Sequence, residues 1–211
     1  MGFYSDHVLP HVIDWSMRNR ALWPYRERVL AKAEGRVLEV GVGSGLNLPF
    51  YAVSNAREIV GLEPSDGLRA IASRAAEHSK RSVTFIKSSA ECMPLESQSV
   101  DTVVLTWTLC SIADASRALA EMRRVLKPSG QLLFVEHGLA PDESVRKWQN
   151  RLTPVWKRMG GGCHLNRPIQ SLIQNAGFAI AQMQTGYMKG PKPVTFMYEG
   201  RATPIWGSNT P

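Results

Sequence analysis

The chain contains 211 residues, of which 44% are hydrophobic and 20% are charged, and its formal net charge is +7. This is an ordinary globular composition at the size of one domain, and it can bury a hydrophobic core. The three cysteines, Cys92, Cys110 and Cys163, are odd in number and widely spaced, which matches neither a disulfide framework nor a zinc-ligand pattern. We therefore expect a cytoplasmic protein without a metal.

Positive charge is concentrated in the last third of the chain. Residues 144–211 contain a single acid, Glu199, against the basic residues Arg146, Lys147, Arg151, Lys157, Arg158, Arg167, Lys189, Lys192 and Arg201. This excess is compatible with an anionic substrate, with weak peripheral association with lipid, or with a solvated face. No nucleic-acid partner is expected, because the basic residues are not interleaved with aromatic residues in a known binding motif. Residues 1–14 have no long apolar run, so we expect neither a signal peptide nor an integral membrane segment.

Two helices are predicted in residues 1–32, where Pro10 and Pro24 mark turns or first-turn positions. We assign residues 1–35 to an N-terminal helical cap. A cap that precedes the first strand can lie across the ligand cleft, which would bring Tyr4 near a substrate. Simple packing of these helices onto the sheet explains the same side chains equally well.

A strand at residues 36–40 leads into the glycine-rich loop Gly41-Val42-Gly43-Ser44-Gly45. Glycine lacks a Cβ atom, so such a loop can adopt positive φ and let a ligand approach the backbone. The loop lacks the Lys-Ser/Thr that ends a P-loop, and Leu46 stands where a dinucleotide fingerprint needs its third glycine. The ligand is therefore not expected to be held by a pyrophosphate.

Two acids stand at the ends of the first two predicted strands. Glu39 lies at the tip of the first strand, where a carboxylate can face a cationic amino group directly or through water. Glu63 follows the strand at residues 58–62 and is placed to accept hydrogen bonds from a ribose diol. Two acids that flank a glycine loop suit a ligand with a ribose, an amino-acid tail and a positive charge. S-adenosylmethionine has all three.

Strands and helices alternate along the rest of the chain. After the glycine loop we predict helices at residues 48–51, 66–78, 115–126, 144–159 and 169–175, and strands at residues 82–87, 102–106, 131–136, 178–181 and 194–198. The alternation indicates parallel strands joined by crossover helices, with the ligand at the carboxyl ends of the strands. The domain is expected to span residues 36–200 and to be followed by a loose tail at residues 201–211.

The glycine loop between Glu39 and Glu63 resembles that of class I S-adenosylmethionine-dependent methyltransferases. The resemblance implies a single-domain, Rossmann-like α/β fold: a mostly parallel seven-stranded sheet with helices on both faces and the N-terminal helices over the cleft. It also implies S-adenosyl-L-methionine as cofactor and S-adenosyl-L-homocysteine as product. The cofactor-binding residues that it implies are Glu39, Gly41, Gly43, Gly45, Asn47, Glu63, Pro64, Ala90, Glu91 and Thr106.

The turn at residues 90–95 is similar to the adenine-side turn of ubiquinone-biosynthesis-type methyltransferases. It reads Ala-Glu-x-x-Pro-Leu and is followed by Ser-Val-Asp at residues 99–101. In those enzymes the residue before the alanine is commonly an acid that contacts the adenine amine. Here that residue is Ser89, so either Glu91 or the backbone is expected to make the contact.

The second half of the chain resembles the alkyl thiol S-methyltransferases of the methyltransferase-like group. The motifs are Thr-Leu-Cys-Ser-Ile at 108–112, Val-Glu-His at 135–137, Trp-Gln-Asn at 148–150 and Gly-Cys-His-Leu-Asn-Arg at 162–167. The resemblance implies in-line methyl transfer to a small apolar thiol or hydrogen sulfide. Animal members have an N-terminal apolar membrane anchor, which we do not find here, so we expect a member without an anchor.

A thiol acceptor must lose its proton, because the thiolate is the nucleophile. His137 is the first candidate for the base or thiolate-stabilising group and His164 is the second, since histidine titrates near neutral pH. For each of them, a structural histidine with both ring nitrogens satisfied is the alternative. The expected substrate-side residues are Tyr4, Trp107, Cys110, Trp148 and Cys163.

Other functions stay open on the sequence alone. Related enzymes N-methylate a phospholipid headgroup amine or another small molecule, and the basic last third of the chain would suit anionic lipid. A non-catalytic S-adenosylmethionine-binding protein is a further alternative, although the acids and glycines of the loop are intact. Metal binding by Cys110 and Cys163, as in arsenic methylation, has weak support because the two cysteines are far apart in sequence. The oligomeric state is open, and a monomer is compatible with the sequence.

Overall fold

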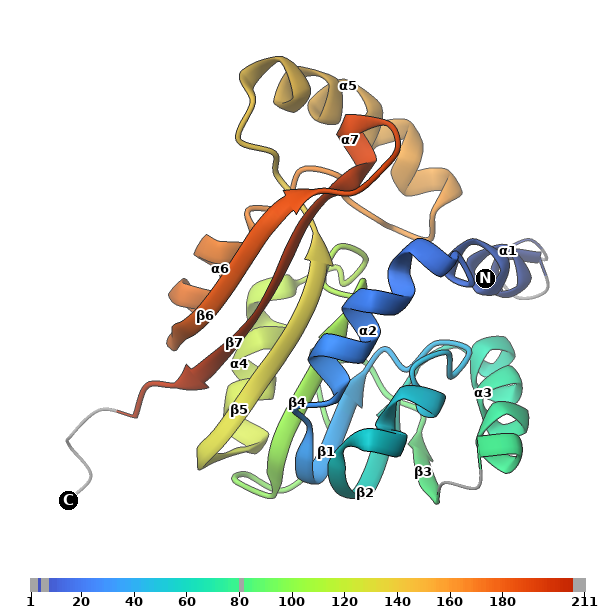
Figure 1. Ribbon diagram of the computed structural model, residues 1–211, viewed down its shortest axis with the longest axis vertical. Helices are drawn as coiled ribbons and strands as arrows, with labels where there is room; N and C mark the ends of the chain where they lie inside the picture. The colour runs from blue at the N-terminus through green and yellow to red at the C-terminus, as the bar shows by residue number, and fades with distance from the viewer. Residues whose placement is uncertain (1–3, 5–7, 80–81, 207–211) are drawn as a thin grey trace.

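Seven strands form one sheet in the order β3-β2-β1-β4-β5-β7-β6 (Figure 1). The computed structural model describes residue 4, residues 8–79 and residues 82–206. The strands are β1 (Glu34–Val40), β2 (Asn55–Leu62), β3 (Val83–Ile86), β4 (Val100–Thr106), β5 (Leu126–His137), β6 (Phe178–Tyr187) and β7 (Phe196–Pro204). The first five strands pair in parallel, whereas β7 runs antiparallel to both β5 and β6. The predicted Rossmann-like fold with a mostly parallel seven-stranded sheet is confirmed.

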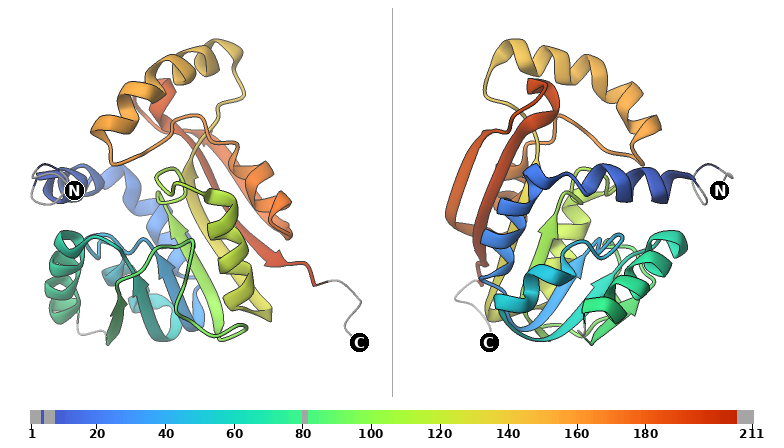
Figure 2. Two further views of the ribbon diagram at one scale, coloured as in Figure 1. Left: turned by 180° about the vertical axis from the view of Figure 1, so that it is seen from behind. Right: turned by 45° about the vertical axis from the view of Figure 1, so that its right-hand side comes forward.

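Helices cover both faces of the sheet, as predicted (Figure 2). One face is covered by α4 (Ala115–Val125) and α6 (Ile169–Asn175), and the other by α2 (Trp23–Leu30), η3 (Leu48–Val53) and α3 (Asp66–Ser79). Successive side chains of a strand point to opposite faces, so Leu38 packs with the α4 side and Val37 with the α2 side. Burial on both faces explains the consecutive apolar residues 37–38 of β1 and 103–105 of β4.

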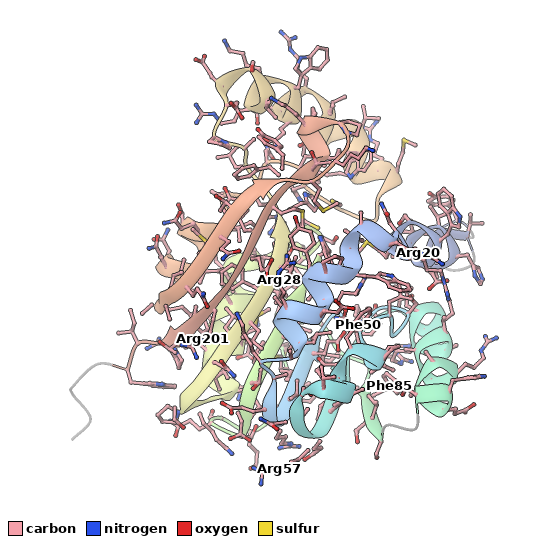
Figure 3. All side chains as sticks on the ribbon, in the orientation of Figure 1. Arg20, Arg28, Phe50, Arg57, Phe85 and Arg201 are labelled. Carbon is pink, nitrogen blue, oxygen red and sulfur yellow. The ribbon has the colours of Figure 1, made fainter. Side chains whose placement is uncertain are left out.

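The second face is stabilised by aromatic packing and by an ion pair with the far end of the sheet. Phe50 of η3 and Phe85 of β3 both pack against the core of this face (Figure 3). On α2, Arg28 donates to both carboxylate oxygens of Glu199 on β7, at 2.6 to 3.2 Å. This pair joins the N-terminal helices to the antiparallel part of the sheet.

The C-terminal segment is more ordered than the sequence predicts. β7 pairs with β6 up to Pro204, which lies opposite Phe178, and the Ile205 amide donates to the carbonyl of Gly177 at 2.8 Å. The expectation of a loose tail from Arg201 is therefore wrong for residues 201–205. The segment is ordered because buried Ala202 and Pro204 alternate with polar neighbours, which is the pattern of a strand. Residues 207–211 of the predicted tail lie outside the described residues.

The remaining helices lie beyond the carboxyl ends of the parallel strands. These are α1 (Leu9–Met17), η2 (Arg20–Leu22), α5 (Glu143–Met159) and α7 (Lys192–Thr195). α1 projects past the end of α2 and lies between α5 and α3 (Figure 2). In this position α1 borders the end of the sheet where ligands bind, as expected for an N-terminal cap.

The apolar side of α5 faces outward, which corrects an expectation for Trp148. Trp148 is 54% exposed and Val155 is 59% exposed, so neither forms a pocket wall. The buried side of the helix instead contains Gln149, whose side chain accepts from the Ala140 amide at 3.0 Å and donates to the Gly138 carbonyl at 2.9 Å. These hydrogen bonds to the turn after β5 orient α5, and they override its hydrophobic pattern.

Candidate active site

A cavity of about 410 Å³ opens at the carboxyl ends of β1, β2 and β4, against α1. This is the place where sheets of this kind bind ligands. It is lined by the following predicted cofactor residues: Glu39, Gly41, Gly43, Asn47, Glu63, Pro64, Ala90, Glu91 and Thr106. The structure thus brings these residues together around one cavity. Their contact with the cofactor itself stays a prediction.

The glycine loop is tightly enclosed at its start. Gly41 has a φ of +67°, and its amide donates to the Leu62 carbonyl at 2.8 Å. A Cβ atom added to Gly41 would lie 2.3 Å from Cγ2 of Thr108. Glycine is needed here both for the left-handed backbone and for the close approach of the loop after β4.

Gly45 has a different role from the one that we expected. It does not line the cavity among the described residues. A Cβ atom at this position would lie 3.2 Å from both Ala72 Cα and Ala75 Cβ on α3. Gly45 therefore lets the loop pack closely onto α3, and its effect on a ligand is indirect.

Glu63 joins the ends of the first two strands. It is only 6% exposed, and its carboxylate accepts from the Gly43 amide at 3.1 Å and from the Ser65 amide at 2.9 Å. Burial raises the pKa of Glu63, and the two backbone N–H groups oppose that rise. Because each carboxylate oxygen can accept more than one hydrogen bond, Glu63 can still accept from a ribose diol in the cavity.

Glu39 lies at the centre of a buried hydrogen-bond network. Asn47 Nδ2 donates to Glu39 Oε1 and to Thr106 Oγ1, both at 2.9 Å, and the Tyr51 hydroxyl donates to Glu39 Oε2 at 2.8 Å. The guanidinium of Arg26 donates to the Asn47 side chain. Burial raises the pKa of Glu39 to about 7, although the Tyr51 and Asn47 hydrogen bonds lower it. A cationic group in the cavity would stabilise the ionised form.

This raised pKa predicts that cofactor binding depends on pH. An ammonium group beside Glu39 lowers the pKa of the carboxyl in the complex, so affinity is full above about pH 7 and is lost as the pH falls through that value. Between about pH 7.5 and about pH 6 we expect the Kd for S-adenosylmethionine to rise about eightfold by this linkage. Isothermal titration calorimetry at several pH values measures it. The control is Glu39→Gln, which removes the titration of Glu39. Parallel pH profiles of the two proteins would contradict the prediction.

The turn after β3, which is predicted to contact adenine, forms one part of the cavity lining. Glu91 Oε1 accepts from the Asp114 amide at 2.7 Å, and Ser89 donates its hydroxyl to the other oxygen of Glu91. Asp114 in turn caps α4 by accepting from the Arg117 amide at 2.9 Å. Glu91 therefore connects this turn to the start of α4, and both Glu91 and the Ala90 backbone remain candidates for the adenine contact.

Part of the cavity lining is apolar. It is formed by Leu9, Ile13 and Met17 of α1 and by Trp107 and Ile112 of the loop after β4. Trp107 has a φ of +49°, which is rare for a bulky residue and is typical of positions held by their surroundings at functional sites. The predicted substrate-side residue Trp107 thus lies in the cavity wall.

Three further predicted residues form a cluster next to the cavity. The ligand atoms of Cys110, His137 and Cys163 lie within 4.8 Å of one another, and His137 Nε2 is 3.1 Å from Cys163 Sγ. Both cysteines are buried. None of the three lines the cavity among the described residues, but Ser111 and Gly161, which neighbour the two cysteine segments, do. The cluster therefore lies behind the cavity wall.

The ionisable groups of the cluster change one another's pKa values. A hydrogen bond from Cys163, together with the charge of His137, holds the pKa of Cys110 well below its usual range. Burial disfavours the charged form of His137, but the Cys110 thiolate and Glu136 together raise the pKa of His137 above its usual value. Burial, and then the Cys110 thiolate, raise the pKa of Glu136 to about 8. These shifts favour a Cys110 thiolate paired with a protonated His137, while Cys110 and burial raise the pKa of the Cys163 thiol.

Two predicted residues lie away from the cavity. Tyr4 is exposed, and its hydroxyl donates to the Met159 carbonyl at 3.2 Å, so it joins the cap to the end of α5. His164 Nδ1 lies 3.0 Å from the Cys110 carbonyl oxygen and 3.2 Å from the guanidinium of Arg167. Neither Tyr4 nor His164 is among the described residues that line the cavity. Both contacts of His164 are made by Nδ1, so they satisfy one of its two ring nitrogens.

Sequence reasoning missed two polar residues of the site, Arg26 and Tyr51. Arg26 is 4% exposed, lines the cavity and lies with its guanidinium carbon 4.8 Å from the ring centroid of Trp107. Burial lowers the pKa of Arg26 to about 10. Both residues stand on helical segments whose patterns predict only packing, and a signal for them would have required the spatial position of Glu39.

Comparisons with known proteins agree with this geometry. Residues 38–134 match the family model described as a methyltransferase domain. The chain is 33% identical over 177 residues to thiol S-methyltransferase TMT1B of Homo sapiens, an alignment that covers 81% of this chain and 70% of the human protein. The chain belongs to the thiol S-methyltransferase family of class I methyltransferases. The predicted membership of the alkyl thiol S-methyltransferase group is therefore confirmed.

Other known proteins are similar to this chain in sequence or in fold. Thiol S-methyltransferase TMT1B of Rattus norvegicus is 37% identical over 153 residues, which are 72% of this chain and 63% of the rat protein. The chain thus spans less than two thirds of that relative. A solved S-adenosylmethionine-dependent methyltransferase of Thermotoga maritima, described as a possible histamine N-methyltransferase, superimposes with a TM-score of 0.67 at 23% identity. That superposition covers 94% of this chain and 96% of the other, and it shows the shared fold.

Within the part of the chain that the structure describes, no helix is long and apolar enough to cross a bilayer.

Proposed function

We propose that this methyltransferase transfers the methyl group of S-adenosylmethionine to a small apolar thiol or to hydrogen sulfide. The observation that supports it best is the apolar lining that α1 and Trp107 contribute to the cavity that Glu39 also lines. A small thiol needs apolar contact and few hydrogen bonds, which this wall supplies. The family relatives, which are named thiol S-methyltransferases, support the same acceptor class.

The residues of the cavity fit the cofactor. Gly43 has a φ of +56°, and a Cβ added to it would meet no atom of the described residues closer than the Gly41 carbonyl oxygen at 3.9 Å, so the backbone there faces open space. Glu39 offers a buried carboxylate for the ammonium group, and Glu63 offers one for the ribose diol. When bound, the cofactor supplies an activated methyl group on a sulfonium.

The part of the protein in the transfer step is mainly positional. In-line displacement requires that the acceptor lone pair be aligned with the methyl carbon and that water be excluded. Trp107 and Ile112, together with Leu9 and Ile13 of α1, form the wall that would exclude water from the acceptor. The acceptor is thus held between the cap and the loop after β4.

The acceptor proton needs no dedicated base in the cavity. An alkyl thiol is already ionised to a few per cent near neutral pH. Arg26 lines the cavity, and its positive charge favours the thiolate. His137 and His164, the expected bases, both lie behind the wall, so we assign this step to neither.

An acceptor panel tests the proposal. The enzyme is incubated with S-adenosylmethionine and, in turn, alkyl thiols, sulfide, phenols, amines and phosphatidylethanolamine vesicles, and S-adenosylhomocysteine release is measured. We expect the thiols and sulfide to be turned over at least about 100-fold faster than the phenols and amines, because a protonated amine or a neutral phenol must first lose a proton to a base that this wall lacks. Turnover of phenols, amines or phospholipid without turnover of any thiol would overturn the thiol acceptor.

A further inference from the structure

We propose that Cys110, His137 and Cys163 bind one thiophilic metal ion, of which Zn²⁺ is the best fit. The three residues come from the loop after β4, the end of β5 and the loop after α5, and their ligand atoms lie within 4.8 Å of one another. Methyl transfer to a thiol does not itself require a metal. The inference therefore goes beyond the proposed function and does not depend on it.

The spacing of the ligand atoms suits a tetrahedral ion. Zn–S bonds of about 2.3 Å and Zn–N bonds of about 2.0 Å place neighbouring ligand atoms roughly 3.5–3.8 Å apart. The observed His137 Nε2 to Cys163 Sγ distance of 3.1 Å and the overall limit of 4.8 Å lie on either side of these values. An ion can therefore be accommodated by rotations of the side chains, without movement of the backbone.

The backbone holds the two cysteine segments together before any ion binds. The His164 amide donates to the Cys110 carbonyl at 2.9 Å. Gly162 has a φ of +90°, and a Cβ atom there would lie 3.2 Å from the carbonyl oxygen of Ser111. The glycines before Cys163 thus allow its loop to approach the Cys110 loop closely, which is the preorganisation that a metal site needs.

Glu136 supports the site from one side. Its Oε1 accepts from the Thr108 amide at 2.8 Å and from the Leu109 amide at 3.0 Å, and so fixes the turn that leads to Cys110. Its Oε2 is buried and has no hydrogen-bond partner among the described residues. Glu136 therefore positions the turn before Cys110 through Oε1 and keeps hydrogen-bonding capacity at Oε2.

The balance of charge and the ligand type both favour zinc. Two thiolates and a neutral imidazole around Zn²⁺ sum to zero, so the ion and its three protein ligands are together neutral. Thiolate and imidazole ligands exclude Mg²⁺ and Ca²⁺, which select oxygen. A monovalent copper ion would leave one uncompensated negative charge. Three protein ligands leave the fourth tetrahedral position for water or a small thiol.

Cobalt substitution tests the site without cofactor, acceptor or turnover. The full-length protein, reduced and freed of metal with a chelator, is titrated with Co²⁺, and the near-ultraviolet thiolate-to-cobalt charge-transfer band is recorded. We expect one equivalent to bind with the band intensity of two thiolates, and Zn²⁺ to displace it. Cys110→Ser, Cys163→Ser and His137→Gln should each weaken binding more than about 100-fold, since losing even an outer-shell partner costs 10–100-fold.

Matched controls make the outcome decisive. Cys92→Ser, at an exposed cysteine, and His78→Gln, at an exposed histidine on α3, should keep wild-type stoichiometry and spectrum. The absence of a thiolate band in the wild-type protein would overturn the proposal, and so would Co²⁺ binding with wild-type affinity by the Cys110→Ser and Cys163→Ser variants. If a site variant does not fold, the wild-type spectrum and its displacement by zinc still decide the question.

Discussion

Glu63→Ala is expected to weaken S-adenosylmethionine binding about 100- to 1,000-fold. The variant removes a carboxylate placed for two charge-assisted hydrogen bonds to the ribose diol, worth together about 3–4 kcal/mol. It also removes the hydrogen-bond acceptor of the Gly43 and Ser65 amides, so the glycine loop loses its connection to the end of β2. Isothermal titration calorimetry gives the Kd, and thermal unfolding shows whether the variant is folded.

Glu58→Ala is the matched control for this variant. Glu58 is a glutamate on the same strand, β2, but it is exposed and pairs with Arg36 at 3.1 Å, outside the cavity. Its replacement should change the cofactor Kd by less than about twofold, because exposed ion pairs contribute little. A folded Glu63→Ala protein with nearly wild-type affinity would show that the ribose is held elsewhere.

The cofactor half of the site could be predicted because its determinants are local. Glu39, the glycine loop and Glu63 fall within 25 residues, on two strands that pair directly, with Glu39 opposite Gly61. The carboxyl ends of adjacent parallel strands must meet at one edge of the sheet. Strand patterning and one topological rule therefore suffice to place these residues around a common cavity.

The cluster of Cys110, His137 and Cys163 behind the cavity wall could not be predicted in this way. Cys110 and Cys163 come from loops that the sequence does not orient, and His137 from the last residue of a strand. Their meeting depends on the hydrogen bonds of Glu136 to the turn before Cys110 and on the close approach of Gly162 to Ser111. Spacing rules for zinc ligands apply to local motifs, so they do not test a cluster that is assembled from separate segments of the chain.

The orientation of α5 shows another limit of pattern reasoning. An apolar stripe with Trp148 and Trp156 predicts a buried face, yet both tryptophans are more than 40% exposed. Gln149, the residue after Trp148, is buried instead and makes three hydrogen bonds to the backbone at Gly138, Ala140 and Pro193. Periodicity identifies the helix and its length, but it does not reveal which side a few specific hydrogen bonds will bury.

Gly41→Ala is expected to destabilise the fold by about 2–4 kcal/mol. A left-handed conformation costs a residue with a Cβ about 1–2 kcal/mol, and overpacking adds about 1–3 kcal/mol, partly offset by the stiffer unfolded chain. The overpacking arises because the new methyl group would lie 2.3 Å from Cγ2 and 2.6 Å from Oγ1 of Thr108. Urea denaturation, followed by circular dichroism, measures the loss in the free energy of unfolding.

Gly43→Ala separates the conformational cost from the steric one. Gly43 also has positive φ, +56°, but its added methyl group would meet only the Gly41 carbonyl oxygen at 3.9 Å among the described residues. We expect Gly43→Ala to cost only about 1 kcal/mol of stability, which is the backbone part. The double variant Gly41→Ala/Thr108→Ala should recover about 1–2 kcal/mol relative to additivity, because the two closest atoms of Thr108 are gone. Equal destabilisation by the two glycine variants, without coupling to Thr108, would mean that the loop after β4 does not enclose Gly41.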